Sequence, residues 1–330
     1  MTTLPTDTAS STRGYTAALA SSLLLSTTAI FIRYLTETYT IPAVLLAFWR
    51  DLLVALTLLL ALVVLRPALL RPGRRHLGYL AVYGILLAVF NALWTLSVAL
   101  NGASVATVLV YSSTAFTAVL AWRFLRERLD WAKGLAVIVC IAGCALVVEA
   151  YDPAVWETNL FGILAGLAAG LGYAVYTMLG RRSSQLGLNP WTTLLYTFGF
   201  ASIALLIFNL LPGELIPGAA RGTGELLWLG DSLAGWGILL LLAAVPTLGG
   251  FGLYNVSLVH LESSVANLVL TTEPIFTVLI AYFLLGERLS LAQIAGGLMI
   301  LAGVVLLRQH EPGSSKPPEE VGLSSITPTD

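Results

Sequence analysis

Long apolar runs separated by short polar breaks constrain this chain more than any other feature of its sequence. A helix needs about 20 mainly apolar residues to cross a bilayer core, where every backbone polar group must be paired within the protein. Ten such runs occur, at residues 14–35, 43–65, 77–100, 103–125, 132–150, 159–181, 191–212, 235–258, 263–285 and 291–308. The sequence therefore predicts an all-α membrane protein with ten transmembrane helices.

The composition argues against a water-soluble globule. Charged residues make up only 11% of the chain, whereas about 25% is usual for soluble domains. The formal net charge of −1 offers no basic surface for nucleic acid. The two cysteines, Cys140 and Cys144, lie four positions apart in one apolar run with no histidine nearby. We interpret them as small packing residues and not as a metal or redox site.

An internal repeat divides the chain into two related halves. When the sequence is shifted against itself by 160 positions, Ser97–Gly143 aligns with Ser257–Gly303 without a gap. The charged turn Glu127-Arg128-Leu129 then falls on Glu287-Arg288-Leu289. An offset of about half the chain indicates two copies of one large unit. We expect a first repeat at residues 14–150 and a second at 159–308, joined by a loop at 151–158, with polar or disordered tails at 1–13 and 309–330.

The distribution of basic residues predicts the orientation. With the N-terminus in the cytoplasm, three of the four cytoplasmic loops between the runs are basic, and they contain Arg66, Arg71, Arg74, Arg75, Arg123, Arg126, Arg128, Lys133, Arg181 and Arg182. The positive-inside rule therefore places both termini in the cytoplasm. Because each repeat holds five spans, the second repeat enters the membrane from the opposite side. Two inverted-topology repeats around a central cavity are the architecture of many secondary transporters.

Three ionisable side chains lie deep inside the expected spans, where they are costly unless they face a cavity or a partner: Arg50, Asp51 and Glu273. Neighbours on a helix point about 100° apart, so we expect that Arg50 and Asp51 do not simply pair with each other. Arg50 either holds a substrate carboxylate or belongs to a structural ion pair. Glu273 binds an ammonium group, carries a proton or belongs to such a pair. Pro274 beside it lacks a backbone donor and suits a hinge or site.

Polar and aromatic residues at mid-helix depth are candidates for the lining of the cavity. Amides and hydroxyls bind zwitterions without fixed charge, and aromatic faces hold ammonium groups. The alternative is hydrogen bonding between helices. The candidates are Tyr83, Asn91, Trp94, Tyr111, Tyr173, Tyr176, Tyr254, Asn255, Asn267 and Thr271. Trp94, Tyr83 and Tyr111 are preferred, because interfacial aromatic belts do not explain large aromatics at midplane depth.

A ladder of glycines lies four residues apart in the sixth run, at Gly162, Gly166 and Gly170. Such ladders let helices approach closely. We interpret this ladder as internal packing, or sliding during gating, in preference to a dimer interface. A monomer is therefore the expected state.

Four motifs suggest a family. They are Phe48-Trp49-Arg50-Asp51-Leu52-Leu53, Thr272-Glu273-Pro274-Ile275-Phe276, Leu285-Gly286-Glu287-Arg288-Leu289-Ser290 and Gly296-Gly297-Leu298-Met299-Ile300-Leu301-Ala302-Gly303-Val304. With them, residues 14–308 resemble the drug/metabolite transporter superfamily, in the ten-helix branch built from two EamA-type halves. The first half departs from the second, because Ser113-Thr114 stands where the second half has Glu-Pro.

The resemblance implies a secondary transporter or facilitator of the bacterial cytoplasmic (inner) membrane that works by alternating access. The chain is similar to exporters of aromatic and other amino acids, which implies small zwitterions and related metabolites as substrates. The alternative within the superfamily is export of drugs, organic cations or purine-type metabolites. The partners expected are therefore a small-molecule substrate and the lipid bilayer.

An enzyme is a poor fit to the sequence. The histidines His76, His260 and His310 lie near span ends or in a tail, and Asp51 is the only aspartate inside an expected span. A phosphate-binding glycine loop with lysine is also missing from the sequence. We expect no catalytic residues, no cofactor and no metal.

Overall fold

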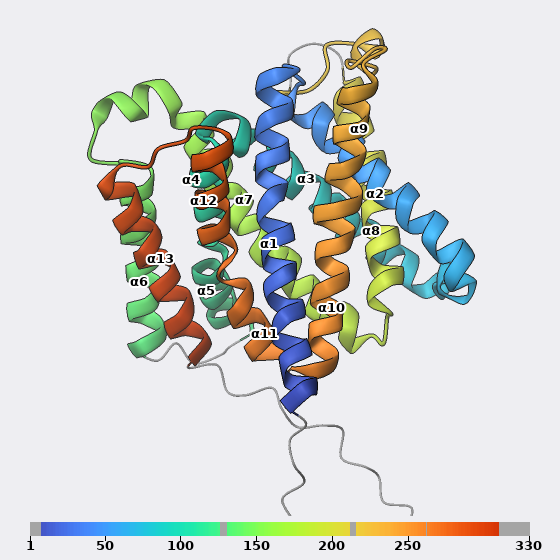
Figure 1. The fold of residues 1–330 in the computed structure, drawn as a ribbon, viewed down its shortest axis with the longest axis horizontal. Coiled ribbons are helices and arrows are strands. Elements are labelled where there is room, and N and C mark those ends of the chain that lie inside the picture. Colours follow the sequence, from blue (N-terminus) through green and yellow to red (C-terminus); the bar gives the residue numbers. More distant parts are fainter. Residues whose placement is uncertain (1–7, 126–130, 212–215, 262, 310–330) are drawn as a thin grey trace, which may run out of the picture.

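The structure, a computed structural model, describes residues 8–125, 131–211, 216–261 and 263–309. Every regular element among these residues is a helix. The α-helices are α1 (Thr8–Thr38), α2 (Ala43–Leu65), α3 (Leu77–Asn101), α4 (Ala103–Val110), α5 (Ser113–Leu125), α6 (Trp131–Val147), α7 (Pro153–Gln185), α8 (Pro190–Leu210), α9 (Leu233–Leu242), α10 (Gly250–His260), α11 (Ser263–Leu270), α12 (Glu273–Leu284) and α13 (Leu291–Gln309) (Figure 1). A π-helical segment, Ala243–Gly249, joins α9 to α10.

Seven helical segments are long and apolar enough to cross a membrane: Thr12–Thr38, Ala43–Leu65, Arg74–Asn101, Ala103–Leu120, Asn159–Gln185, Pro190–Leu210 and Leu233–Leu258. The shorter apolar helices Lys133–Val147, Glu273–Leu284 and Leu291–Leu307 lie within the other three expected spans. An all-helical membrane protein is thus confirmed for the described part of the chain. The count of ten crossings and their inverted arrangement stay predictions.

Two spans that the sequence predicts as continuous are broken. Residues 103–125 form α4 and α5, separated by a turn at Tyr111-Ser112, and residues 263–285 form α11 and α12, separated by a turn at Thr271-Thr272. The second break has a clear cause, since Pro274 cannot donate to the carbonyl four residues earlier and its ring crowds that turn. The two breaks lie 160 positions apart, which is the offset of the sequence repeat.

Two segments differ in secondary structure from what the sequence predicts, while the repeat bounds themselves stay predictions. Residues 8–13, expected in a polar tail, open α1, whereas residues 1–7 and 310–330 lie outside the described part of the chain. The predicted loop at 151–158 is mostly helical, because α7 begins at Pro153, and a kink at Asn159 separates this segment from the span that follows. The side chain of Asp152 accepts a hydrogen bond from the Ala154 N–H, and a proline at the first helical position costs no hydrogen bond.

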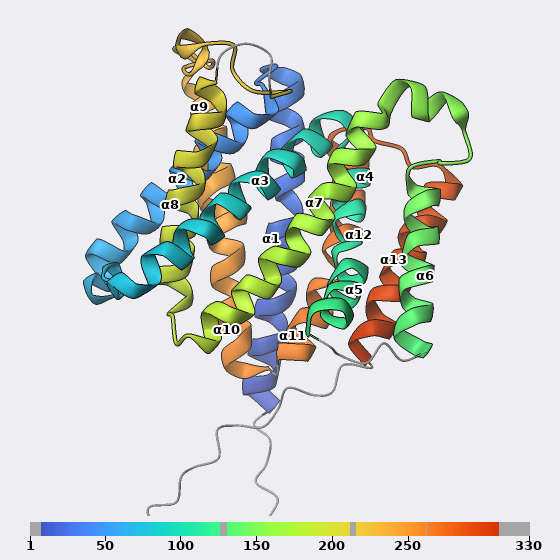
Figure 2. The ribbon, with the colours of Figure 1, turned by 180° about the vertical axis from the view of Figure 1, so that it is seen from behind.

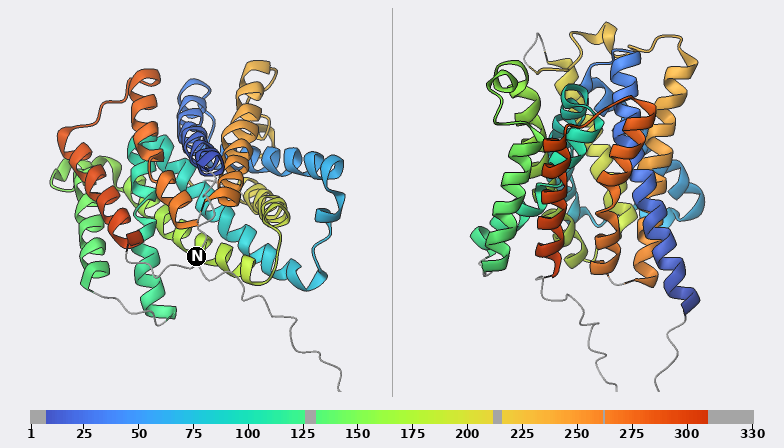
Figure 3. Two further views of the ribbon diagram at one scale, coloured as in Figure 1. Left: turned by 60° about the horizontal axis from the view of Figure 1, so that its bottom comes forward. Right: turned by 60° about the vertical axis from the view of Figure 1, so that its left-hand side comes forward.

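The helices form one bundle around α1. In Figure 1, α1 runs through the middle with α12 and α10 on either side, and both helices contact it. Seen from behind, α3 crosses the bundle obliquely between α7 and α8 (Figure 2). The start of α1 and the end of α13 lie at the same end of the bundle (Figures 1 and 3). We call this the terminal end, and the other the loop end, where α1 turns into α2.

Helices α6 and α13 pack against each other at one edge through small residues. A Cβ on Gly143 would lie 2.7 Å from the Gly296 carbonyl oxygen, and a Cβ on Gly303 would lie 3.0 Å from the Ala136 carbonyl oxygen. At the repeat offset of 160, Gly143 corresponds to Gly303 and Ala136 corresponds to Gly296. The repeat offset therefore exchanges the two contacts, because it converts the first pair of residues into the second. Cys140 is buried at the same crossing, where its thiol donates to the Ile300 carbonyl oxygen at 3.7 Å.

Candidate functional site

The two helix breaks meet inside the bundle. The Tyr111 hydroxyl donates toward the Leu270 carbonyl oxygen and toward Oε2 of Glu273, each at 3.0 Å. Pro274 is the reason that Leu270 can accept this bond, because Pro274 has no N–H for the carbonyl four residues before it. Tyr111, Glu273 and Pro274 were each singled out by the sequence, but their contact was not foreseen.

The carboxylate of Glu273 lies at the start of a helix. Glu273 is the first residue of α12, and Thr272 before it makes no side-chain capping bond. Unpaired N–H groups and the helix dipole favour negative charge at this end. Among the described residues, none of the salt bridges involves Glu273, so its hydrogen-bond partner is a neutral phenol. A carboxylate held in this way is available to a cationic group.

Two hydrogen bonds with α1 tie the second break and the start of α12 to the centre of the bundle. Ser22 Oγ and Thr272 Oγ1 lie 2.9 Å apart, and the Thr277 hydroxyl donates to the Ser26 carbonyl oxygen at 3.2 Å. Ser22 and Ser26 are buried and lie one helical turn apart. The role of Ser22 was missed, although serines at helical spacing in an apolar run are a usable signal.

Arg50 and Asp51 pair with each other, which corrects the prediction from the sequence. Arg50 Nε and Nη2 donate to Asp51 Oδ1 at 3.2 and 3.1 Å, and Asn91 Nδ2 donates to Oδ2 at 2.7 Å. Their exposed fractions are 3% for Arg50 and 0% for Asp51. The two Cα–Cβ bonds diverge, but the long arginine side chain bends back across the angle. Its guanidinium also lies 5.4 Å from the centroid of the Trp94 ring.

An aromatic row extends from Trp94 along α3 and α7. Phe90 lies 6.4 Å from Trp94 and 5.3 Å from Tyr173 between ring centroids. Tyr176 lies 6.0 Å from Tyr173 and 4.9 Å from Tyr83. Four of these five residues were predicted from the sequence to line the cavity. Phe90 was missed, because a phenylalanine in an apolar run gives no distinguishing signal. Trp94 connects this row to the Arg50–Asp51–Asn91 cluster, because it also contacts Arg50.

The remaining candidates belong to α10, α11 and the second break. Tyr254 and Asn255 are half-buried in α10, and the Asn255 amide donates to the Phe251 carbonyl oxygen of its own helix at 3.0 Å. Thr271 is buried in the second break. The side chain of Asn267 lies outside the described part of the structure.

The glycine ladder of α7 faces α3 and α4. A Cβ on Gly162 would lie 2.8 Å from Asn101 Oδ1, and one on Gly166 would lie 2.6 Å from Leu109 Cδ1. A Cβ on Gly170 would lie 2.5 Å from Ser112 Oγ. These contacts leave no room for a methyl group, and they lie within the chain itself.

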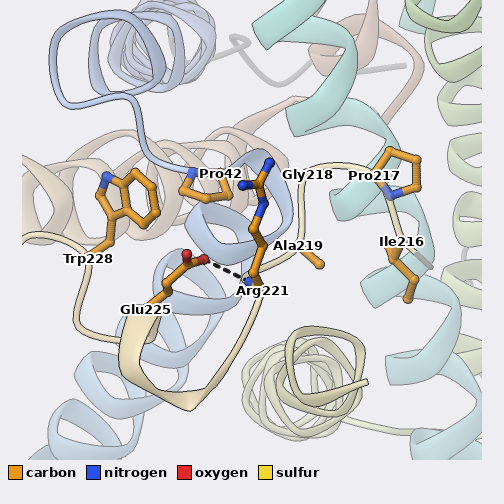
Figure 4. A pocket seen from close by; sticks show the side chains of 8 residues that line it. All are labelled: Pro42, Ile216, Pro217, Gly218, Ala219, Arg221, Glu225 and Trp228. Atoms are coloured by element: carbon orange, nitrogen blue, oxygen red, sulfur yellow. Dashed lines mark hydrogen bonds between the residues drawn. The ribbon is translucent and has the colours of Figure 1, made fainter. Parts of the chain in front are cut away.

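Two hollows lie at helix ends and not at mid-depth. One of about 500 Å³ lies beside the turn from α1 to α2 and is lined by Pro42, Ile216, Pro217, Gly218, Ala219, Arg221, Glu225 and Trp228 (Figure 4). The other, of about 270 Å³, lies between the end of α3 and the start of α7, and its polar lining includes Asn101, Glu149, Asn159 and Gln293. The predicted cavity residues line neither hollow, so a central cavity stays a prediction.

The chain belongs to the EamA-like transporter family, whose model matches residues 12–149 and 160–309. An uncharacterized transporter of Archaeoglobus fulgidus is 29% identical over 240 residues, covering 72% of this chain and 77% of the relative. The uncharacterized transporter YdfC of Bacillus subtilis is 27% identical and covers 78% and 79%. The fold is similar to that of a solved crystal structure, with a TM-score of 0.57 and 17% sequence identity. The match covers 91% of this chain and 97% of the chain in that structure.

Family and fold together define a multi-pass membrane transporter of the drug/metabolite transporter superfamily. The expected class is therefore confirmed. The names of the relatives specify no substrate.

Proposed function

We propose that the chain is a secondary transporter or facilitator of the bacterial inner membrane that exports aromatic and other small zwitterionic amino acids by alternating access. The observation that supports this most is the contact between the two helix breaks, through Tyr111 and Glu273. Discontinuous helices in corresponding positions of two repeats are where such transporters bind substrates and coupling ions.

The proposal includes ten crossings in two inverted repeats, with both termini in the cytoplasm. The exchange of the Gly143 and Gly303 contacts by the repeat offset supports it, because a two-fold axis in the membrane plane would produce such an exchange. Each repeat then contributes one broken helix to the centre. Rocking of one repeat against the other would open the site to each side in turn.

Glu273 is the proposed binding and coupling group. As a carboxylate it accepts from Tyr111 and can bind a substrate ammonium group, whereas protonation removes its charge. Substrate and proton therefore compete for one group, which is the requirement for exchange of the two. The Tyr111 hydroxyl from the first break contacts this carboxylate, and the Thr272 and Ser22 hydroxyls contact each other beside the second break.

The alternative cargo, an organic cation, is favoured by one observation. Arg50 is already bonded to Asp51, so a substrate carboxylate would have to displace that carboxylate to reach it. Glu273, beside the Tyr111 ring, would suffice for a cation without a carboxylate. An amino-acid cargo carries a carboxylate that the site must accommodate, whereas an organic cation does not.

Counterflow in proteoliposomes distinguishes the cargoes. Vesicles loaded with an unlabelled compound are given the labelled compound outside, using phenylalanine, alanine, adenine and tetraethylammonium, with equal or unequal pH across the membrane. Accumulation of the amino acids is expected. Accumulation of tetraethylammonium or adenine, without accumulation of either amino acid, would contradict amino-acid export and favour the alternative cargo.

The Glu273→Gln variant tests the coupling group. Glutamine keeps the shape and an acceptor oxygen but cannot ionise, so transport should lose its dependence on the pH gradient, and binding of the ammonium group should weaken. Tyr111→Phe is the matched control, because it removes the partner and keeps the titratable carboxyl. An unchanged pH dependence in Glu273→Gln would remove Glu273 from the mechanism.

A further inference from the structure

The connection from α2 to α3 carries a concentration of positive charge. It contains four exposed arginines and no acidic residue: Arg66, Arg71, Arg74 and Arg75. Among the described residues, none of the salt bridges involves these four. The connection lies at the outer edge of the bundle (Figures 1 and 2). Its charges therefore face outward, where a partner outside the chain can reach them.

The helices around this connection do not compensate its charge. Residues 52–126 and 158–213 contain no aspartate or glutamate, and these stretches include the end of α2, all of α3 and α8 and most of α7. The Tyr79 hydroxyl in α3 donates to the Leu179 carbonyl oxygen in α7. This contact brings the end of α7, with the exposed Arg182, to the same side of the bundle. An anion that approaches here therefore meets positive charge from two connections.

Helix α8 holds the backbone of the connection in place. The Thr192 hydroxyl donates to the Leu69 carbonyl oxygen at 2.8 Å, and the Tyr196 hydroxyl donates to the Leu70 carbonyl oxygen at 2.9 Å. Both acceptors belong to a turn of 3-10 helix, Pro67–Leu70, and both leucine side chains pack against the hydrophobic core. A ligand would meet a preformed backbone and would have to order only the arginine side chains.

The surface next to these arginines is apolar. Val63, Val64 and Leu65 end α2, and their exposed fractions are 50%, 79% and 72%. Three consecutive helical residues point about 100° apart, so these side chains cover most of the circumference of the helix. Because Ala43–Leu65 is long and apolar enough to cross a membrane, lipid chains surround this end of the helix. Arg66 then begins the connection at the depth of the lipid headgroups.

We infer that the connection from α2 to α3 is a binding surface for anionic phospholipids. The arginines bind the phosphate of the headgroup, which a guanidinium matches with paired hydrogen bonds. The acyl chains of the same lipid lie against Val64 and Leu65. Basic clusters beside a membrane span attract anionic lipids, and each arginine adds to the attraction. Lipid binding of this kind does not depend on which cargo the protein exports.

Native mass spectrometry of the purified full-length protein in detergent measures this binding. The protein should retain phosphatidylglycerol in preference to phosphatidylcholine with the same acyl chains, because only the first headgroup has a net negative charge. Higher ionic strength should reduce the preference, since salt screens exposed charges. Glycerophosphoglycerol, which is the same headgroup without acyl chains, should not displace the lipid, because it cannot contact the apolar end of α2.

Charge variants locate the binding surface. Arg71→Gln/Arg74→Gln should weaken the binding of phosphatidylglycerol roughly thirtyfold, at about fivefold for each arginine near the membrane surface. Arg71→Lys/Arg74→Lys keeps both charges and should keep most of the binding. The matched control is Arg13→Gln/Arg288→Gln, which removes two exposed arginines outside this connection and should leave the preference unchanged.

Equal retention of the two lipids by the native protein would overturn the inference, and that comparison needs no variant. An unchanged preference in Arg71→Gln/Arg74→Gln would also overturn it. An equal loss in the control variant would show that the net charge of the protein attracts the lipid, and not this connection. Displacement by glycerophosphoglycerol would show a site for soluble phosphate esters in place of a lipid surface.

Discussion

At the scale of the residue, Arg50 and Asp51 show how burial decides the role of a charge. Both are enclosed, Asp51 accepts from Arg50 and from Asn91, and the guanidinium lies over Trp94. A buried ion pair adds little net stability, but removal of one partner leaves the other charge uncompensated. The geometry therefore favours the structural interpretation of Arg50 over its use as a substrate-carboxylate site.

Asp51→Ala should lower the free energy of unfolding by about 3–5 kcal/mol, because it strands the guanidinium of Arg50 in an apolar interior. The double variant Arg50→Met/Asp51→Leu removes both charges and should recover most of that loss. Denaturation of the purified protein in detergent measures both. A double variant that is less stable than Asp51→Ala would contradict the structural role.

At the scale of the element, small residues and caps decide which helices can pack together. Glu287 caps α4, since its carboxylate accepts from the N–H groups of Ala103 and Ser104 at 2.7 and 2.9 Å. Gly102, at φ +84°, leaves room for this carboxylate, because a Cβ there would lie 2.8 Å from it. The repeated Glu-Arg turn was predicted, but not its capping function. Its first copy, at Glu127, lies outside the described residues.

Gly296→Ala should destabilise the crossing of α6 and α13. Its Cβ would lie 2.6 Å from the Gly143 carbonyl oxygen, so the helices must separate, at a cost of about 1–3 kcal/mol. Gly297→Ala is the matched control, because its Cβ would meet only Val108 at 3.8 Å. Thermal unfolding in detergent measures the difference. Equal melting temperatures for the two variants would show that the crossing is not tightly packed.

At the scale of the whole molecule, the distribution of basic residues predicts the direction in which the chain crosses the membrane. The basic loops predict that Arg75 lies in the cytoplasm, and ten crossings then place Asp231 outside. Both residues are exposed, and the native cysteines are buried. Single cysteines at these two positions can therefore report the orientation.

In intact cells, a membrane-impermeant maleimide should label Asp231→Cys, and it should label Arg75→Cys only after the cells are permeabilised. Labelling of both positions from outside would contradict the predicted crossings between them. The reverse pattern would leave the number of crossings possible but invert the orientation and place the loop end on the cytoplasmic side.

The sequence by itself determined the class of this protein. Backbone groups in lipid must pair within their own segment, so apolar runs of this length leave the helix as the main solution. The repeat offset, together with the Glu273-Pro274 and Glu287-Arg288 motifs, was then enough to predict the family. Position within a run also selected Glu273, Tyr111 and Trp94, because polar and aromatic side chains at that depth are unusual.

Only the tertiary structure decided which of these residues meet. The Tyr111–Glu273 contact joins residues 162 positions apart, and Trp49 reaches Leu226 across 177 positions. Such contacts depend on helix breaks, crossings and side-chain torsions together, and no local pattern encodes them. The Arg50–Asp51 pair was mispredicted for a related reason, because backbone direction alone does not fix where a long side chain ends. The larger hollow, beside the turn from α1 to α2, likewise exists only because α1, α2 and α8 fold together beneath one loop.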